Sequence, residues 1–282
     1  MKGVRQTSGV AIGVVLCASV MFCVAPARSQ DVPVWNQYAN SMLIKTRTAA
    51  TYPENLWVFT LVGYYQDLDN TANQALNRKQ ATYVAWAEYG VRNWMQLGVA
   101  MPYIMRETKD AATGADDKVN GLGDLNLYGK CRLLTENASR PALTVDGFVK
   151  VPTGDKDKGL SNDKTDVTVA AEASKRFGLL SLHFNPEYVF TGGDKASLGA
   201  PADDRFNLNV GVMWHATASL VPMIEYNGFW WRDNGKESDV GGGVLWFPTK
   251  NTSVKLGVAF PVSENVTWKP DWTPWVKLAT WF

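Results

Sequence analysis

The sequence predicts an all-β protein, a twelve-stranded antiparallel transmembrane β-barrel of the bacterial outer membrane. Three observations support this fold class. Segments about ten residues long alternate apolar and polar side chains, which matches both the period of a β-strand and the length of a tilted strand that crosses a bilayer. The links between these segments are alternately long and short, as in bacterial barrels. The outward aromatic residues also fall at two heights.

The clearest strand pair lies between Gly121 and Pro152. One face of this hairpin is apolar and carries Leu125, Leu127, Gly129, Cys131 and Leu133, followed by Leu143, Val145, Gly147, Val149 and Val151. The other face is polar and carries Asp124, Asn126, Tyr128, Lys130 and Arg132, followed by Thr144, Asp146, Phe148 and Lys150. Because side chains alternate across a strand, an outer-membrane barrel would turn the apolar face to lipid and the polar face to its interior.

Three strands are predicted before this hairpin, each with apolar residues at alternate positions. They are Leu56–Gln66 with Trp57, Phe59 and Leu61; Ala81–Tyr89 with Tyr83, Ala85 and Ala87; and Trp94–Arg106 with Leu97, Val99 and Met101. Gly90–Asn93 is a short link, whereas Asp67–Lys79 and Glu107–Asn120 are polar and are expected to be loops.

Seven strands are predicted after the hairpin, by the same alternation. They are Thr165–Arg176 with Val167 and Val169; Leu180–Thr191 with Leu182 and Phe184; Arg205–His215 with Leu208 and Val210; Leu220–Trp231, whose polar face holds Glu225 and Asn227; Ser238–Phe247; Thr252–Val262 with Val254 and Leu256; and Thr273–Phe282 with Val276 and Leu278. An even strand count with this loop asymmetry places both termini in the periplasm.

The outward aromatic residues sort by height along these strands. Those expected near the outer rim are Tyr65, Tyr83, Tyr103, Tyr188, Phe190, Phe206, Trp230 and Phe260. Those expected near the inner rim are Trp57, Tyr89, Trp214, Trp246 and Phe282. Two aromatic girdles around an aliphatic band are typical of a bilayer-spanning barrel, whereas the core of a soluble sandwich has no reason to sort aromatics in this way.

The chain of 282 residues opens with a predicted secretory signal peptide. Lys2 and Arg5 precede an apolar run over Val10–Val24, and Ala25-Pro26-Ala27 offers a small-x-small cleavage site. We therefore expect residues 1–27 to be removed, or a few more if cleavage falls as late as residue 30. Residues 28–55 lack a strand period and are interpreted as a periplasmic N-terminal extension that can fold into the barrel mouth. Residues 56–282 are assigned to the barrel.

Removal of the signal peptide also fixes the expected cysteine content and charge. Cys17 and Cys23 leave with it, so Cys131 alone remains and no intramolecular disulfide is expected. The full chain carries 28 Lys and Arg against 27 Asp and Glu. This balance gives no electrostatic reason to bind nucleic acid.

The polar face provides the candidate lumen-lining residues. They are Asp124, Asn126, Tyr128, Lys130, Arg132, Asp146, Lys150, Asp166, Glu172, Glu187, Glu225, Lys255 and Lys277. The predicted register sets Lys130 beside Asp146 and Lys150 near Asp166. These charges could pair to fill a narrow lumen, since buried charges need compensation, or they could form a polar constriction that selects permeants. Inward aromatics such as Trp86 and Phe148 could stack on an aromatic permeant or simply fill the lumen.

The two histidines suggest a further arrangement inside the barrel. If Thr191 pairs with Arg205, His183 faces Met213 and His215 is its diagonal neighbour, with Glu172 close by. Two imidazoles and a carboxylate could bind a divalent transition metal, or the histidines could form a pH-sensitive brace. The alternative is two unrelated lumen histidines that hydrogen-bond to their neighbours. No cofactor is otherwise expected.

Two motifs and the last residue resemble one protein family. The motifs are Gly121-Leu-Gly-Asp-Leu-Asn-Leu-Tyr-Gly-Lys130 and Val149-Lys-Val-Pro-Thr-Gly-Asp155, and the chain ends on Phe282. Together they resemble the outer-membrane barrel transporters of the phenol-degradation meta-pathway family. The resemblance implies passage of small, often aromatic or apolar, molecules. The terminal Phe282 is like the signal that the outer-membrane assembly machinery recognises.

These observations predict an outer-membrane channel whose partners are outer-membrane lipids and a small-molecule permeant. One alternative is a barrel with a filled lumen that acts as a structural anchor. Another is a lipid-modifying outer-membrane enzyme, but the two histidines of the mature chain fall near the periplasmic end and no Gly-x-Ser-x-Gly motif is present. We therefore expect no enzymatic activity.

Overall fold

The structure is a computed structural model that describes residues 45–70, 73–192, 203–233, 235–265 and 268–282. The predicted signal peptide and most of the predicted N-terminal extension lie outside the described residues. None of the described segments forms a helix long and apolar enough to cross a membrane.

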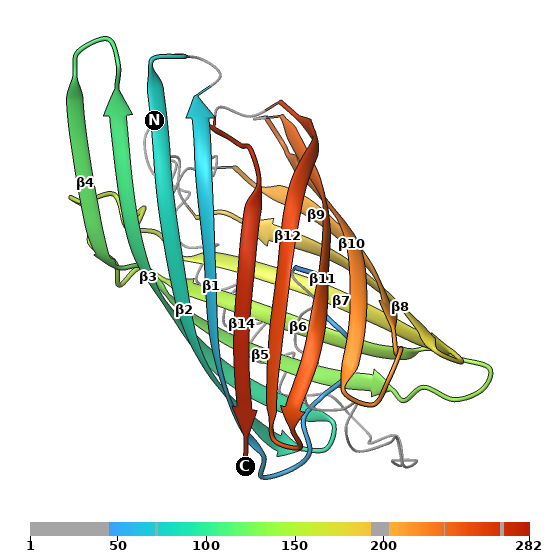
Figure 1. The fold of residues 1–282 in the computed structure, drawn as a ribbon. Coiled ribbons are helices and arrows are strands. Elements are labelled where there is room, and N and C mark those ends of the chain that lie inside the picture. The colour runs from blue at the N-terminus through green and yellow to red at the C-terminus, as the bar shows by residue number, and fades with distance from the viewer. Residues whose placement is uncertain (1–44, 71–72, 193–202, 234, 266–267) are drawn as a thin grey trace.

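The described chain folds into one closed antiparallel β-barrel (Figure 1). Its strands are β1 (Trp57–Asn70), β2 (Leu76–Arg92), β3 (Met95–Asp110), β4 (Ala115–Leu122), β5 (Leu125–Leu134), β6 (Ala142–Val151), β7 (Asp166–Phe177), β8 (Leu180–Phe190), β9 (Arg205–Trp214), β10 (Leu220–Trp231), β11 (Lys236–Thr249), β12 (Thr252–Glu264), β13 (Trp268–Pro270) and β14 (Thr273–Trp281). The barrel closes because β1 pairs with β2 on one side and with β14 on the other.

The fourteen strands occupy only twelve places around the barrel, because in two cases a pair of consecutive strands shares one place. β4 and β5 both pair with β3, one after the other, so together they form one interrupted strand. β13 and β14 pair in the same way with β1. The barrel therefore has twelve strands, as the sequence predicts.

Alternation along each strand separates the two faces of the barrel wall. On β1, Trp57 and Phe59 are 43% and 41% exposed, whereas Val58 between them is completely buried. Most of the outward aromatics named above are exposed on the barrel exterior, among them Tyr83, Tyr103, Phe206, Phe260, Trp214, Trp246 and Phe282. Outward apolar and inward polar residues are the pattern that lipid selects in a membrane barrel.

The main difference from the prediction is the length of two hairpins. Asp67–Lys79 and Glu107–Asn120 were expected to be loops, but most of their residues extend β1–β2 and β3–β4 into long arms. In the first arm Asp67 is paired with Lys79, and in the second Glu107 is paired with Lys118. Both faces of these arms are polar, so a search for alternating hydrophobicity misses strands held by cross-strand charge pairs.

The strand registers confirm two predicted pairs and correct a third. Lys130 lies opposite Asp146, and Lys150 lies opposite Asp166. The predicted pairing of β8 with β9 is wrong by two residues, because His183 faces Gly211 rather than Met213. A shift of two residues leaves every side chain on its own face, so alternation cannot detect it.

The two sequence motifs meet where β4 gives way to β5. The Asp124 carboxylate accepts the Gly154 N–H at 3.0 Å, and the Thr153 hydroxyl accepts the Leu125 N–H at 2.9 Å. Gly154 is required here, since a Cβ would lie 2.8 Å from the Leu160 carbonyl oxygen. The motifs therefore join the interrupted strand to the loop that follows β6.

Candidate functional site: a peptide segment held inside the barrel

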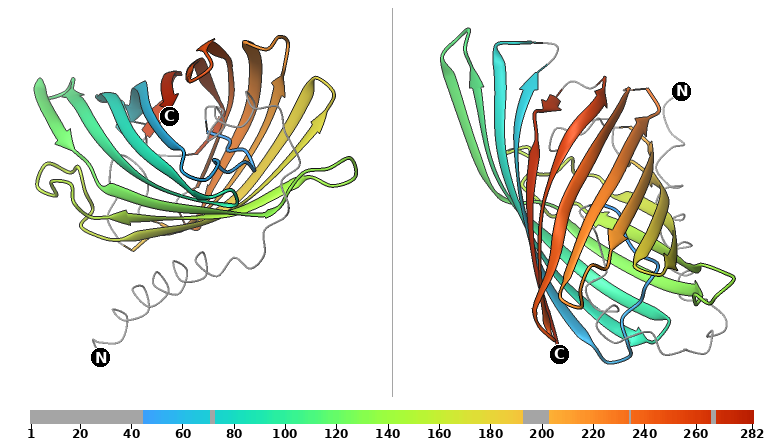
Figure 2. Two further views of the ribbon diagram at one scale, coloured as in Figure 1. Left: turned by 90° about the horizontal axis from the view of Figure 1, so that it is seen from below. Right: turned by 45° about the vertical axis from the view of Figure 1, so that its right-hand side comes forward.

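A short N-terminal segment, residues 45–54, lies inside the barrel. Figure 2 shows this blue segment within the ring of strands, just before it enters β1. Its middle is almost completely buried, with Thr46, Thr48, Ala49, Thr51 and Tyr52 each 5% exposed or less. The segment is named here the lumen segment.

Side chains of the barrel wall satisfy the backbone of the lumen segment, which pairs with no strand. The Glu225 carboxylate accepts the N–H groups of Lys45 and Thr46 at 2.8 and 3.1 Å. The Ala49 N–H donates to Ser174 Oγ at 2.8 Å, and the Tyr52 N–H donates to Gln96 Oε1 at 2.9 Å. Asn185 donates to the Arg47 carbonyl at 2.8 Å and also accepts the Arg47 N–H.

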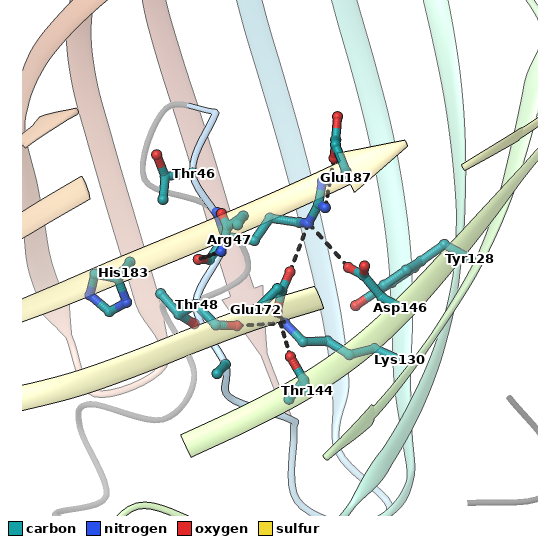
Figure 3. Close-up of polar contacts among 12 residues, drawn as sticks. Thr46, Arg47, Thr48, Tyr128, Lys130, Thr144, Asp146, Glu172, His183 and Glu187 are labelled. Carbon is teal, nitrogen blue, oxygen red and sulfur yellow. Dashed lines mark hydrogen bonds and ion pairs between the residues drawn. The ribbon is translucent and has the colours of Figure 1, made fainter. Parts of the chain in front are cut away.

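The side chain of Arg47 is the centre of this arrangement (Figure 3). Its Nε lies 2.7 Å from Glu172 Oε1 and 3.1 Å from Asp146 Oδ2. The Nη2 atom of Arg47 pairs with Glu187 Oε2 at 2.7 Å, and the guanidinium carbon lies 5.0 Å from the centre of the Phe148 ring. One guanidinium therefore joins three carboxylates from β6, β7 and β8, as its planar set of donors allows.

Lys130 completes the network from the barrel wall. Its ammonium donates to the Thr48 carbonyl at 2.6 Å and pairs with Glu172, which also accepts the Thr144 hydroxyl at 2.8 Å. Lys130 and Glu172 are each 1% exposed. Buried charges of this kind are stable only when they are paired and hydrogen-bonded, and removal of one partner is strongly destabilising.

The opposite side of the lumen segment contacts aromatic and amide side chains. The Tyr52 hydroxyl donates to Glu88 at 3.0 Å, and Gln96 hydrogen-bonds both Glu88 and Tyr128. The Tyr128 ring stacks on Phe148 with 5.0 Å between centroids, and Trp86 meets both rings edge-on. Lys45 pairs with Asp239, and its ammonium lies 5.0 Å from the Phe229 ring.

Cavities lie on either side of this network. One of about 180 Å³ is lined by residues of β1, β2, β10, β12 and β14, including Tyr64, Trp86, Lys255, Trp275 and Lys277. Another of about 140 Å³ lies beside Thr48–Thr51 and is lined by His183, His215 and Arg132 among others. Beside Arg47, Tyr128, Phe148 and Trp86 only about 10 Å³ is free. The side chains around Arg47 therefore leave almost no free space between them.

The structure places the predicted lumen residues in separate groups. Asp146, Glu172 and Glu187 bind Arg47, while Tyr128 and Lys130 contact the same network. Lys150 pairs with Asp166 at 2.7 Å and Asp124 at 3.3 Å, and Asn126 donates to the Asp124 carbonyl at 3.0 Å. Arg132 donates to the Asn93 carbonyl at 2.6 Å, and Glu225 holds the start of the lumen segment. Lys255 and Lys277 face each other across β12 and β14.

The predicted metal cluster of His183, His215 and Glu172 is not formed. The described residues contain no group of three or more His, Cys, Asp or Glu side chains that could hold a metal ion. Both Glu172 oxygens are engaged by Arg47, Lys130 and Thr144, while His183 Nδ1 lies 2.8 Å from Ser174 Oγ and His215 Nε2 contacts Ser181 Oγ. The Glu172 carboxylate is therefore engaged by two cations and a hydroxyl rather than by the two imidazoles.

Sequence reasoning missed the residues of the lumen segment, above all Lys45, Arg47 and Tyr52. Nothing in strand periodicity marks them, because the segment is extended but has no strand partner. The available signal is charge: two cations stand shortly before the first strand of a barrel whose inward face is rich in carboxylates. A buried carboxylate needs a cation, and the nearest unassigned ones lie in this segment.

Comparisons with known proteins agree with this architecture. A family model described as "Putative MetA-pathway of phenol degradation" matches residues 89–269. An outer membrane channel from Pseudomonas putida F1 superimposes with a TM-score of 0.68 at 12% identity, covering 82% of this chain and 97% of that one. No curated protein sequence matches the chain.

Two bacterial autotransporter domains share the fold more distantly. The translocator domain of NalP from Neisseria meningitidis gives a TM-score of 0.52 at 8% identity, covering 81% of this chain and 89% of that one. The beta domain of the Bordetella autotransporter BrkA gives 0.50 at 11% identity, covering 82% of this chain and all of that one, 100%. At such identities the likeness concerns the fold alone.

Proposed function

The chain belongs to the outer-membrane barrel family described as "Putative MetA-pathway of phenol degradation", and we propose that it is a channel for small aromatic or apolar molecules. The Pseudomonas putida F1 protein that shares the fold over 97% of its length is an outer membrane channel. Family membership and this fold support passage across the outer membrane rather than catalysis.

The observation that carries the proposal is the aromatic-walled cavity of about 180 Å³ inside the lumen. Tyr64, Trp86 and Trp275 line it together with Val62 and Val84. An apolar cavity of about 150 Å³ is enough to bind benzene, so one aromatic ring fits this space. A barrel that served only as an anchor would gain stability by filling it.

Because almost no space is free beside Arg47, we infer that passage of a solute there requires movement of the lumen segment. The segment is held by side-chain hydrogen bonds and ion pairs instead of a continuous strand ladder. It can therefore shift without opening the barrel wall. We propose that the segment controls the width of the channel.

Uptake into cells tests the proposal directly. The full chain is produced in a porin-deficient Gram-negative strain, and the initial uptake of a labelled single-ring aromatic is measured at low external concentration. We expect faster uptake than in the same strain without the protein, together with ion conductance of the purified protein in planar bilayers. If neither uptake nor conductance changes, the filled-lumen anchor is the better reading.

The enzyme alternative receives no support from the placement of the serine–histidine pairs. Ser174 with His183 and Ser181 with His215 lie on the inward face of β7, β8 and the end of β9. A lipid-modifying enzyme needs its nucleophile where it can reach lipid. The buried His183 and His215 side chains are each only 6% exposed.

A further inference from the structure

The cavity of about 180 Å³ is lined almost entirely by carbon atoms. Val62 and Val84 lie directly opposite each other on β1 and β2, and both line it. The Tyr64 and Trp275 rings stack at 4.5 Å between centroids with 25° between planes, and Met223 lines the cavity from β10. The indole nitrogen of Trp275 is buried in the wall and adds almost no polar surface to this space. Aliphatic and aromatic side chains from several strands therefore enclose one apolar space.

The polar groups of the lining residues have partners outside the cavity. Tyr64 lies directly opposite Thr82, and its hydroxyl hydrogen-bonds with that side chain. Lys255 and Lys277 both interact with the Glu88 carboxylate. Since the cavity surface is carbon, these lysines line it with their aliphatic stems, as long cationic side chains often do. A solute in this cavity therefore meets carbon on nearly every side.

The second cavity, of about 140 Å³, shows that such a lining is not general to the lumen. Its wall includes Arg132, Glu136, Lys175 and His183, so polar groups contribute to its surface. The network around Arg47 is likewise made of ion pairs. The carbon-lined cavity is therefore a distinct place within a largely polar interior.

A carbon-lined cavity discriminates between rings that differ only in a polar substituent. The apolar surface of a ring gains free energy on leaving water, whatever substituent the ring carries. A hydroxyl or carboxylate that enters with the ring loses its hydrogen bonds to water and finds no partner in the wall, which lowers affinity about tenfold or more. The size also fits, because a cavity of about 150 Å³ binds benzene and the present one leaves room for a small alkyl group.

We propose that this cavity selects single-ring hydrocarbons, of which toluene is the model, over hydroxylated or charged rings of the same size. This inference rests on the proposed channel function and narrows its substrate class. The ring packs against Tyr64, Trp86 and Trp275, and the paired valines Val62 and Val84 determine specificity because they offer no hydrogen-bond partner. Phenol and benzoate enter with an unsatisfied polar group and bind more weakly.

Methyl NMR of the full chain in detergent, isotopically labelled at methionine, tests the proposal. The Met223 methyl reports on the cavity and is assigned by its loss in Met223→Leu. Met105, on the exposed outer face of β3, reports solute dissolved in the detergent. We expect toluene to saturate the Met223 shift at an aqueous concentration at least about tenfold lower than phenol does, and benzoate to give no shift. Equal concentrations for toluene and phenol, or a Met223 shift that only follows the Met105 shift, overturn the proposal.

Two variants test whether the carbon lining causes the preference. Val62→Thr and Val84→Thr keep the shape of the side chain but add a hydroxyl that can pair with the phenol hydroxyl. Each should strengthen phenol binding and weaken toluene binding, so that the ratio between them shrinks at least about threefold. Val189→Thr adds the same hydroxyl at a buried position on β8 outside the cavity and should leave the ratio unchanged. A full toluene preference in both lining variants contradicts the proposal.

The outcome is separable from the proposed function. Aromatic uptake without any preference for toluene at Met223 supports the channel and rejects the selective cavity. Toluene preference without uptake or conductance supports the selective cavity and rejects the channel. Boiled and unboiled samples of each variant on a denaturing gel show whether the barrel has folded, and a variant that fails this check is replaced by Val62→Ser or Val84→Ser.

Discussion

At the scale of single residues, Arg47 forms three ion pairs inside the barrel. It brings one cation to Asp146, Glu172 and Glu187, and Lys130 is the second cation in contact with Glu172. The three carboxylates belong to the barrel wall, but Arg47 belongs to the lumen segment. The same ion pairs that stabilise the inward face therefore determine where the segment lies.

Arg47→Met should release the lumen segment and raise channel conductance several-fold. Without the guanidinium, Asp146, Glu172 and Glu187 lose the cation that they share, and breaking a buried pair of this kind costs about 3–5 kcal/mol. Single-channel recording in planar bilayers measures the effect. Arg47→Lys keeps the charge but loses the planar fork, so its conductance should lie between those of the other two proteins.

Two further variants separate release of the segment from general damage. Arg232→Met removes an exposed pair with Asp204 and should leave conductance unchanged. A disulfide between Ala49→Cys and Ser174→Cys, whose N and Oγ atoms are 2.8 Å apart in the native chain, should return Arg47→Met to low conductance. Persistent high conductance in this cross-linked protein would contradict the role of the segment.

At the scale of elements, the β1–β2 and β3–β4 arms extend beyond the apolar band of the barrel. Their outer residues are largely charged, and several pairs are exposed, including Lys118 with Asp116 and Lys109 with Glu107. Exposed pairs contribute little to stability. The arms therefore add surface at the rim rather than strength to the barrel wall.

Replacement of residues 107–118 by an Asn-Gly turn, which would join the paired residues Arg106 and Val119, should leave barrel assembly and conductance unchanged. The deleted residues pair with one another and with the β2 arm, while the lumen network lies further down the barrel. An Asn-Gly dipeptide closes a two-residue hairpin without strain. The gel shift between boiled and unboiled samples and the single-channel conductance are the measurements, and loss of the folded band would show that the arm is structural.

The loop after β6 should respond to pH through Asp155. The backbone N–H of Lys158 donates to this carboxylate, which holds the pKa of Asp155 below its usual range. A depressed folded-state pKa means that its stabilising contribution is present above the unfolded pKa of about 3.9 and is lost as pH falls through the lower folded value. Amide exchange of Lys158 by NMR should accelerate in that acidic window, and Asp155→Ala should show fast exchange already at neutral pH.

At the scale of the whole molecule, alternation and aromatic girdles were enough to predict the barrel. Leu220–Trp231 was predicted with both of its ends, and the strand count and closure are confirmed. Lipid requires apolar side chains at every second position of a strand, so the sequence of each strand shows which residues face lipid and which face the lumen. The arms were missed because water imposes no such period on them.

The candidate site was only partly predictable for a related reason. Wall residues such as Glu172 and Lys130 follow from the inward period, but their partner Arg47 lies in a segment without any period. The β8–β9 register was also predicted wrongly, because a shift of two residues leaves each side chain on the same face of the sheet. Contacts between a strand and a non-repeating segment depend on three-dimensional packing that pattern analysis does not encode.

The seam between β1 and β14 leads to the last prediction, which concerns closure of the barrel. The Trp57 and Phe282 backbones exchange hydrogen bonds at 3.0 and 3.1 Å, and the Phe282 ring stacks on Phe59 at 5.6 Å between centroids. The wild type should migrate differently when boiled and unboiled, as a closed barrel does. Phe282→Ala should lower the temperature at which the folded band disappears, because a stacked pair contributes about 0.5–1.5 kcal/mol. Phe206→Ala removes an outward aromatic that meets Trp230 at 5.8 Å, away from the seam. If this temperature falls equally in both variants, Phe282 contributes only as one more girdle residue and has no special part in closing the barrel.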